Sequence, residues 1–172
     1  MKNTKAGMGS HQSHVMITDE WLTPPEIVKA LGPFDLDPCS PINRPWDTAK
    51  THYTRPIALF EPGGLEKPWF GRVWLNPPYG KHTGKWLKKL SEHGNGIALI
   101  FARTETRMFF DYIWYKATAA LFIEGRVQFY KKDGTLPEGG NNSGAPSVLI
   151  AYGKQNAEIL KDSNTKGKFL YL

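Results

Sequence analysis

The sequence predicts an α/β fold, in which a mostly parallel sheet is covered by helices on both faces and carries an antiparallel hairpin at one edge. Two apolar runs without polar alternation, 96–101 and 119–123, are typical of strands buried on both faces. Segment 83–93 has the apolar spacing of a helix, and the aromatic-rich segment 105–116 also reads as helical. The length of 172 residues suits one compact domain.

The composition fits a nucleic-acid partner and excludes several other classes of site. Lys and Arg number 22 against 16 Asp and Glu, which gives a net charge of +6, and aromatic residues make up 13% of the chain. Positive charge holds phosphates while rings stack on bases, although a charge of this size also serves solubility alone. The single cysteine, Cys39, excludes a disulfide within the chain and a zinc cluster built from cysteines. Nothing nearby completes a site around His11 and His14, so we expect no metal.

The ends of the chain differ in composition from its centre. Residues 1–17 are small and polar and predict a flexible tail, while 154–172 is lysine-rich and weakly patterned and predicts a basic C-terminal tail. The domain is then expected over 18–153. No apolar run approaches the ~18–20 residues that span a bilayer, and the N-terminus lacks the apolar stretch of a secretory signal. We therefore expect a cytoplasmic protein without membrane attachment.

The first half of the chain predicts one helix, one short strand and a long irregular stretch. We expect the helix over 24–31, with Thr23 as its N-cap and Glu26 completing a capping box. Residues 34–38 predict a short strand that ends in a polar turn. The stretch 39–70 is rich in proline and has no clear period.

The second half predicts the remaining strands. Residues 72–75 form a compact apolar strand that precedes the helix over 83–93. Segments 127–130 and 147–152 are expected to pair as the edge hairpin, across the glycine-rich loop 131–146.

The tetrapeptide Asn76-Pro77-Pro78-Tyr79 is the most informative motif. It follows the strand over 72–75, and ligands in open α/β sheets bind beyond the carboxyl ends of strands. Asn76 offers an amide oxygen, and Pro77 offers a carbonyl without a neighbouring N–H at a fixed φ. Pro78 restricts the residue before it, and Tyr79 adds a flat ring with a polar tip.

Two fixed acceptors beside an aromatic ring match a planar amine that bears two N–H donors. The exocyclic amine of adenine is a poor nucleophile because its lone pair is delocalised into the ring. Acceptance of both protons favours a pyramidal nitrogen whose lone pair points at an incoming methyl group, and no general base is needed before attack. Positioning and electrostatics would then supply most of the rate. The alternative interpretation is a proline-ended strand with a capping asparagine.

The chain resembles the N-6-adenine DNA methyltransferases, most closely the short phage and prophage Dam family. The Asn-Pro-Pro-Tyr tetrapeptide is a hallmark of amino-group methyltransferases, and further segments follow in the family's order: Trp21–Pro25, Phe34–Cys39, Gly125–Phe129 and Ala145–Val148. The resemblance covers about residues 18–153. It implies a Rossmann-like S-adenosylmethionine-dependent methyltransferase fold.

The resemblance also assigns roles to individual residues. It implies that Asn76 and the Pro77 carbonyl bind the amine, that Pro78 completes the catalytic tetrapeptide, and that Tyr79 stacks on an adenine flipped out of DNA. It assigns S-adenosylmethionine binding to Asn76 together with Thr23, Asp35, Asp37 and Pro38. For Thr23 the N-cap alternative stays open, and both roles are compatible because a helix N-terminus also attracts a carboxylate.

The chain departs from the wider family at two points. Relatives outside this short group carry a glycine-rich turn after the first strand, where this chain has Pro38–Pro41, so the cofactor pocket would differ in shape. An acidic residue for the cofactor ribose is not obvious, and Asp47 and Glu61 are the candidates.

Basic residues surround the expected site. Lys81 and Lys85 follow the tetrapeptide directly, while Arg103 and Arg107 follow the next strand along the chain. We expect these four side chains to bind the phosphates of double-stranded DNA.

Other basic and polar residues are assigned differently. Lys88 and Lys89 are better explained as the solvated face of a helix. We expect no separate recognition domain in this sequence, so sequence preference would come from the loops 39–58 and 131–145, with base readout by Arg44, Asn141 or Asn142.

Three functions remain open at this point. The first is a cytoplasmic, site-specific enzyme that methylates adenine in DNA, in a restriction–modification or phage setting. The second applies the same chemistry to adenine in RNA or to a glutamine amide in a protein, since an amide NH₂ presents the same two donors. The third is a non-catalytic DNA-binding relative that has lost cofactor binding. A monomer is the default assembly.

Overall fold

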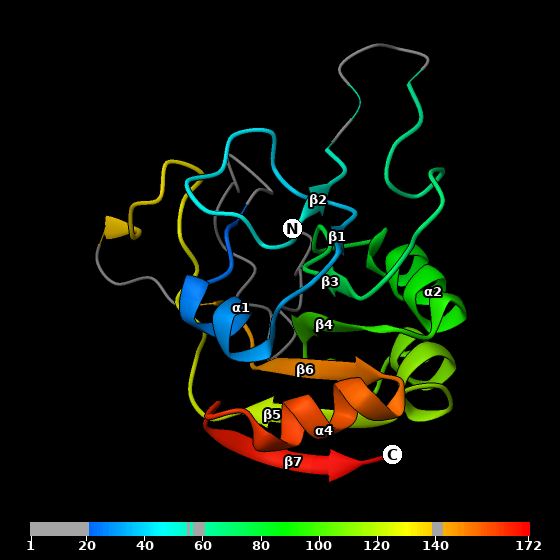
Figure 1. The fold of residues 1–172 in the computed structure, drawn as a ribbon. Coiled ribbons are helices and arrows are strands. Elements are labelled where there is room, and N and C mark those ends of the chain that lie inside the picture. Colours follow the sequence, from blue (N-terminus) through cyan, green and yellow to red (C-terminus); the bar gives the residue numbers. More distant parts are fainter. Residues whose placement is uncertain (1–20, 55, 57–60, 139–142) are drawn as a thin grey trace, which may run out of the picture.

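One sheet of seven strands organises the part of the chain that the computed structural model describes, residues 21–54, 56, 61–138 and 143–172 (Figure 1). The expected tail over 1–17 lies outside these residues. The strand order is β2-β1-β3-β4-β6-β5-β7. The strands are β1 (Leu36–Asp37), β2 (Thr51–His52), β3 (Val73–Leu75), β4 (Gly96–Phe101), β5 (Ala119–Ile123), β6 (Ser147–Tyr152) and β7 (Gly167–Tyr171).

Among the described residues, helices lie before β1 and in the connections β3–β4, β4–β5 and β6–β7. They are α1 (Pro25–Leu31), α2 (Thr83–His93), α3 (Arg107–Phe109), which continues into the π-helix η1 (Phe110–Trp114), and α4 (Lys154–Asp162). The α/β class is confirmed, as are the helix over 83–93 and the strands over 96–101 and 119–123.

The sheet is mostly parallel, but its antiparallel part is not the expected hairpin. β6 and β7 run opposite to the other five strands, and β6 lies between β4 and β5 instead of at an edge. All six residues of β6 are buried, which suits the interior of a sheet. The expected partner segment 127–130 forms no strand, because Tyr130 makes a single bridge to Leu22 instead.

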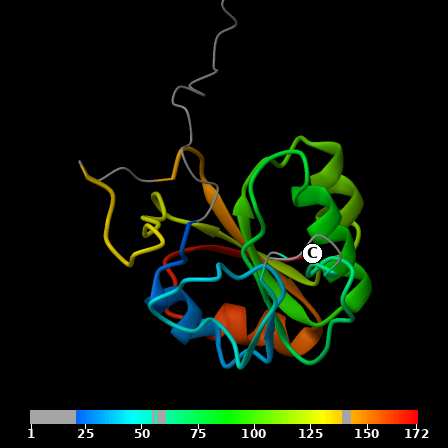
Figure 2. The same ribbon diagram turned by 90° about the horizontal axis from the view of Figure 1, so that it is seen from above.

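Two apolar clusters cover the two faces of the sheet. Figures 1 and 2 show the helices that lie over these faces, with α1 and α4 on one side and α2 on the other. Side chains alternate along each strand, so Trp74 packs with α1 and α4 while its neighbours Val73 and Leu75 pack with α2 and η1. Strands β1 and β3 are parallel neighbours, so their carboxyl ends lie at the same edge of the sheet. The loops that follow these two strands meet at that edge.

The basic tail expected over 154–172 is wrong. This segment forms α4 and β7, and β7 pairs with β5 at the edge of the sheet (Figure 1). Ala157 and Leu160 are fully buried against the sheet, while the lysines of α4 face solvent. Two buried apolar side chains among nine residues made a weak sequence signal, but tertiary packing is what stabilises a short amphipathic helix.

The capping box predicted for the first helix is also wrong. α1 begins at Pro25, with Pro24 in the N-cap position and no side-chain cap. The main-chain carbonyl of Pro24 accepts from the N–H of Ile27 at 3.1 Å. The hydroxyl of Thr23 is buried elsewhere, without a hydrogen-bond partner.

Candidate active site

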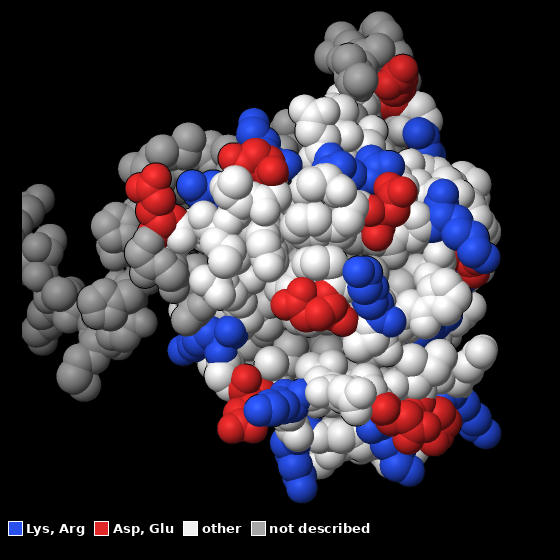
Figure 3. Space-filling model, turned by 60° about the vertical axis from the view of Figure 1, so that its left-hand side comes forward, with Lys and Arg blue, Asp and Glu red and all other residues white. Residues whose placement is uncertain are grey.

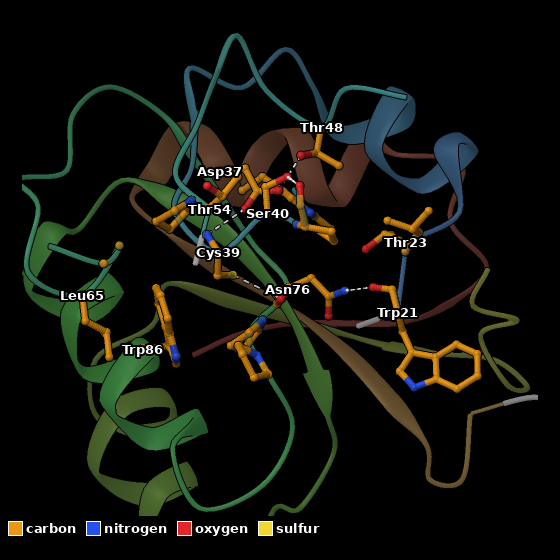
Figure 4. A pocket seen from close by; sticks show the side chains of 18 of the residues that line it. Trp21, Thr23, Asp37, Cys39, Ser40, Thr48, Thr54, Leu65, Asn76 and Trp86 are labelled. Atoms are coloured by element: carbon orange, nitrogen blue, oxygen red, sulfur yellow. Dashed lines mark hydrogen bonds between the residues drawn. The ribbon is translucent and has the colours of Figure 1, made fainter. Parts of the chain in front are cut away.

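A cavity of about 310 Å³ opens beyond the carboxyl ends of β1 and β3, the place expected for a ligand of an open α/β sheet (Figure 4). Four parts of the chain line it: residues 21–23, residues 37–41 together with Thr48, Thr54 and Pro56, the loop 63–66, and residues 76–79 together with Trp74 and Trp86. The tetrapeptide predicted as catalytic therefore lies in the same cavity as Thr23, Asp37 and Pro38.

The amide of Asn76 has a defined orientation. Its Nδ2 donates to the main-chain carbonyl of Trp21 at 3.2 Å, so its Oδ1 faces the other way as an acceptor. The hydroxyl of Tyr79 donates to this oxygen at 3.3 Å. Among the described residues no donor reaches the carbonyl of Pro77, whereas the carbonyl of Pro78 accepts from the hydroxyl of Thr83 at 2.8 Å. The structure thus leaves Pro77 with acceptor capacity.

The ring of Tyr79 has one face covered. It stacks on Phe101, with ring centroids 4.1 Å apart and planes inclined by 14°. It also makes an edge-to-face contact with Phe129, with ring centroids 6.1 Å apart. Desolvation by burial raises the pKa of the Tyr79 phenol well above its ordinary value, so the hydroxyl is neutral near pH 7. Only the face turned away from Phe101 can accept a planar ligand.

Asp37 is a buried carboxyl group that the fold provides with donors. It accepts from the hydroxyl of Thr48 and, at 3.1 Å, from the main-chain N–H of Cys39. Desolvation by burial outweighs these bonds and raises the pKa of Asp37 to about 6. The carboxyl group of Asp37, at the wall of the cavity, therefore changes its charge near pH 6.

Asp35, also expected to bind the cofactor, lies outside the cavity. Its carboxylate accepts from the main-chain N–H of Arg72 at 2.9 Å and forms an ion pair with Lys50 at 3.0 Å. These contacts lower the pKa of Asp35, the hydrogen bond from Arg72 contributing most. Its side chain joins the start of β3 to the loop before β2, which is a structural task.

Thr23 is one of the residues that line the cavity. Its residue is 97% buried by surface area, its Oγ1 has no hydrogen-bond partner, and its carbonyl accepts from the indole N–H of Trp46 at 3.2 Å. An unpaired hydroxyl at the wall of a cavity is suited to a polar ligand, because a buried polar group without a partner is costly. This observation replaces the N-cap interpretation.

Several residues of the cavity carry no recognisable sequence signal. Thr48 and Thr54 belong to the irregular stretch and line the cavity, since β2, which lies between them in the chain, pairs with β1. Trp86 has the position of a core residue on α2, yet it lines the cavity and stacks on Trp69 with ring centroids 6.2 Å apart. Gly64 allows the loop 63–66 to lie close to the main chain of Pro38, since a Cβ at residue 64 would lie 1.8 Å from the carbonyl oxygen of Pro38.

The acidic residues proposed for a ribose lie elsewhere. Asp47 forms an ion pair with Arg44 at 3.1 Å, and neither Asp47 nor Glu61 lines the cavity. Glu66 does line it, next to the Gly-Gly-Leu sequence at 63–65. Arg44, expected in base readout, also contacts His52 of β2 at 3.0 Å, while Asn141 and Asn142, expected in the same role, lie outside the described residues.

The basic residues near the site divide into two groups. Lys81, Lys85, Arg103 and Arg107 are exposed, and Arg107 reaches Asp111 at 3.3 Å. Lys89 is not part of a solvated face, because its Nζ donates to the carbonyls of Leu65 and Lys67 at 2.6 Å each. Lys88 pairs with Glu92 at the surface, as expected for that face. Figure 3 shows Lys and Arg interspersed with Asp and Glu on the face it presents, without one large basic patch.

Comparison with known proteins identifies the family of the chain. The family model for DNA N-6-adenine-methyltransferase (Dam) matches residues 10–169. The chain belongs to this family. The match includes α4 and most of β7, so the Dam family's extent agrees with a domain that continues past residue 153. Neither the curated proteins nor the solved structures contain a match.

Membership of the Dam family implies DNA adenine methylation as the activity and DNA as the substrate. The mixed α/β sheet is compatible with a methyltransferase-like fold. Within the described ranges no helix is long and apolar enough to cross a lipid bilayer, and no group of three or more His, Cys, Asp or Glu side chains is placed to hold a metal ion.

Proposed function

We propose that this Dam-family protein transfers a methyl group from S-adenosylmethionine to the exocyclic amine of adenine in DNA, on a Rossmann-like fold. The observation that carries the proposal is the pair of acceptors at the end of β3. The Oδ1 of Asn76 is oriented by the bond from Nδ2 to Trp21, and the adjacent Pro77 carbonyl has no donor among the described residues.

These two acceptors match what the amine needs. By accepting its two N–H groups, Asn76 and Pro77 draw the nitrogen away from planarity and direct its lone pair outward. Asn76 and Pro77 are fixed before the substrate arrives, so their dipoles need no reorganisation during the reaction. S-adenosylmethionine supplies an electrophilic methyl group. The amine nitrogen becomes acidic only when it is methylated, so no side chain has to deprotonate it beforehand.

Tyr79 would hold the flipped base. Its covered face rests on Phe101, and stacking of an adenine on the opposite face would be worth ~1–3 kcal/mol. The Tyr79 hydroxyl already donates to Asn76 Oδ1, so ring and acceptor are held in one relative orientation. An oxygen has two lone pairs, which leaves one for the amine.

The residues of the cavity also suit S-adenosylmethionine. The unpaired hydroxyl of Thr23 and the carboxyl of Asp37 offer polar partners for its amino-acid end, while the ring of Trp86 and the close approach at Gly64 provide an apolar wall. Pro38 borders the same cavity. Asp35 takes no part in this proposal.

The four exposed basic residues Lys81, Lys85, Arg103 and Arg107 would bind DNA phosphates around the opening. Such contacts make the affinity fall with salt and leave sequence preference to other groups. We place the reaction in the cytoplasm, with a monomer as the working assembly.

One assay tests the proposed function. DNA from a methylation-deficient host is incubated with the protein and methyl-labelled S-adenosylmethionine, digested to nucleosides and analysed by mass spectrometry. The expected product is N6-methyldeoxyadenosine. Label in RNA or in glutamine of a protein mixture, with none in DNA, would contradict DNA as the substrate. Absence of S-adenosylmethionine binding by calorimetry would contradict the methyltransferase activity and leave a DNA-binding module.

A further inference from the structure

Three consecutive main-chain carbonyls follow β3, and side chains hold the first and the third of them. The carbonyl of Asn76 accepts from the thiol of Cys39 at 3.2 Å, and the carbonyl of Pro78 accepts from the hydroxyl of Thr83 at 2.8 Å. Between them, the carbonyl of Pro77 has no donor among the described residues. The carbonyl proposed to accept from the amine therefore lies between two peptide groups that are anchored by side chains.

The two proline rings leave little rotational freedom between the anchored groups. Each ring fixes its own φ at about −65°, and a residue before a proline is restricted to extended values of ψ. The freedom that remains at Pro77 is a limited rotation about its ψ. Because the peptide bond is planar, this rotation would turn the Pro77 carbonyl and displace Pro78 at the same time. The bond from Thr83 to Pro78 opposes that displacement, so the Thr83 hydroxyl helps to fix the direction of a carbonyl that it does not contact.

Thr83 is itself held firmly. It is the first residue of α2 and is only 6% exposed. Gly80, with a φ of +121°, begins a turn in which the main-chain N–H of Thr83 donates to the Gly80 carbonyl at 3.2 Å. The rest of α2 shares an apolar cluster with β3 through the fully buried Leu87 and Leu90. The Thr83 hydroxyl therefore ties the tetrapeptide to a helix that is packed on the sheet.

We propose that Thr83 is a positioning residue for methyl transfer, whose hydroxyl acts through Pro78 to keep the Pro77 carbonyl directed at the amine of the target adenine. The proposal rests on the proposed function. An acceptor contributes to the rate only when it is oriented before the reaction, so a small rotation of this carbonyl should slow the transfer. Thr83 does not line the cavity, so its loss should leave S-adenosylmethionine binding intact. A threonine that served packing alone would need its methyl group, whereas this role needs its hydroxyl.

Three substitutions at residue 83 separate the hydroxyl from the packing. Thr83→Val keeps the shape and loses the donor, Thr83→Ser keeps the donor, and Thr83→Cys has a weaker donor. We expect kcat for DNA methylation to fall roughly 10- to 100-fold in Thr83→Val and to stay within about 3-fold of wild type in Thr83→Ser. Thr83→Cys should lie between them. The KM for S-adenosylmethionine should be that of wild type in all three.

Ser163→Ala is the matched control. It removes a hydroxyl that also donates to a main-chain carbonyl at 2.8 Å, that of Leu160, but at the end of α4. Because Ser163 does not line the cavity and has no contact with the tetrapeptide, kcat should equal that of wild type.

A second measurement addresses the amine directly. A duplex with purine in place of the target adenine lacks the amine, so the ratio of affinities for the two duplexes reports the bonds to the amine together with the cost of flipping the base. Comparing this ratio between wild type and Thr83→Val cancels the cost of flipping. We expect the preference for adenine to be roughly 3- to 10-fold smaller in Thr83→Val.

Equal kcat values and equal affinity ratios in wild type and Thr83→Val would overturn the role of Thr83. A slower Thr83→Val with the affinity ratio of wild type would also overturn it, since the loss would then not act through the amine. If Thr83→Val does not fold, Thr83→Ser and Thr83→Cys decide, and equal kcat values in these two would overturn the proposal. Absence of methyl transfer to DNA by the wild-type protein would instead overturn the proposed function.

Discussion

Asn76 carries an acceptor and a donor on one side chain, and the surrounding residues distinguish the two. The Trp21 carbonyl binds the nitrogen and the Tyr79 hydroxyl binds the oxygen, so the orientation of the amide follows from two contacts. The tetrapeptide could be predicted from its residue types and its place after a strand. The partner at residue 21 could not, because it lies 55 positions away and its carbonyl has no side-chain signature.

Asn76→Ala should reduce the methylation rate at least about 100-fold, because one of two oriented acceptors is lost. The free energy of unfolding should fall by only about 1 kcal/mol, for the lost bond to Trp21. Methyl incorporation measures the rate, and urea unfolding measures the free energy of unfolding. Asn164→Ala, on the exposed connection between α4 and β7, is the control and should match wild type. Retained turnover in Asn76→Ala would contradict the assignment.

The pH dependence of stability should reveal Asp37. Its pKa is raised from 3.8 to about 6 in the folded protein, so the folded state binds its proton more tightly than the unfolded state. Ionisation of Asp37 then destabilises the fold as the pH rises from about 4 to about 6, by roughly 3 kcal/mol in total. Asp37→Asn cannot ionise and should lack this change. Urea unfolding of both proteins between pH 4 and pH 8 measures the difference, and parallel curves would show that Asp37 ionises as freely as in the unfolded chain.

At the scale of elements, local pattern and outcome agree where the pattern is strong. The helix over 83–93 and the strands over 96–101, 119–123 and 147–152 have the bounds that their apolar spacing predicts. β2 was missed because two residues form a strand only through their partner β1. The position of β6 was missed because local sequence does not encode which strand lies beside which.

Gly64→Ala tests the loop that closes one wall of the cavity. The added Cβ would meet the Pro38 carbonyl oxygen at 1.8 Å, so the loop 63–66 must move outward. We expect a loss of roughly 1–3 kcal/mol in stability and weaker binding of S-adenosylmethionine. Gly144→Ala is the matched control, since nothing lies within 4 Å of its added Cβ. Calorimetric affinity equal to wild type in Gly64→Ala would show that this loop does not shape the site.

On the scale of the whole molecule, the last segment of the chain completes the sheet. α4 covers one face and β7 extends the edge beyond β5, so residues far from the cavity support the strands that carry it. The sequence pattern of this segment is weak because half of it faces water. The exposed lysines of this segment therefore predict a tail, although its few apolar residues are buried.

Leu160→Ala should cost about 2–5 kcal/mol of stability, as expected for a leucine that is fully buried in the core. Gln155→Ala, exposed on the same helix, should stay within about 0.5 kcal/mol of wild type. Thermal or urea unfolding distinguishes the two. An unchanged free energy of unfolding in Leu160→Ala would contradict the packing of this segment against the sheet and favour a tail.

The bond between Asn76 and the Trp21 carbonyl has a further consequence for how the site can fail. The two ends of a carboxamide are nearly the same size, so a half-turn of the side chain would keep the packing and exchange oxygen for nitrogen. Two N–H groups would then face the two N–H groups of the amine, and attraction would become repulsion. Detachment of the segment 21–23 removes the contact that opposes this half-turn. We expect the polarity of the proposed acceptor to be controlled in this way by a stretch of chain that precedes α1, so that loosening this stretch would abolish the proposed methylation while the core stays intact.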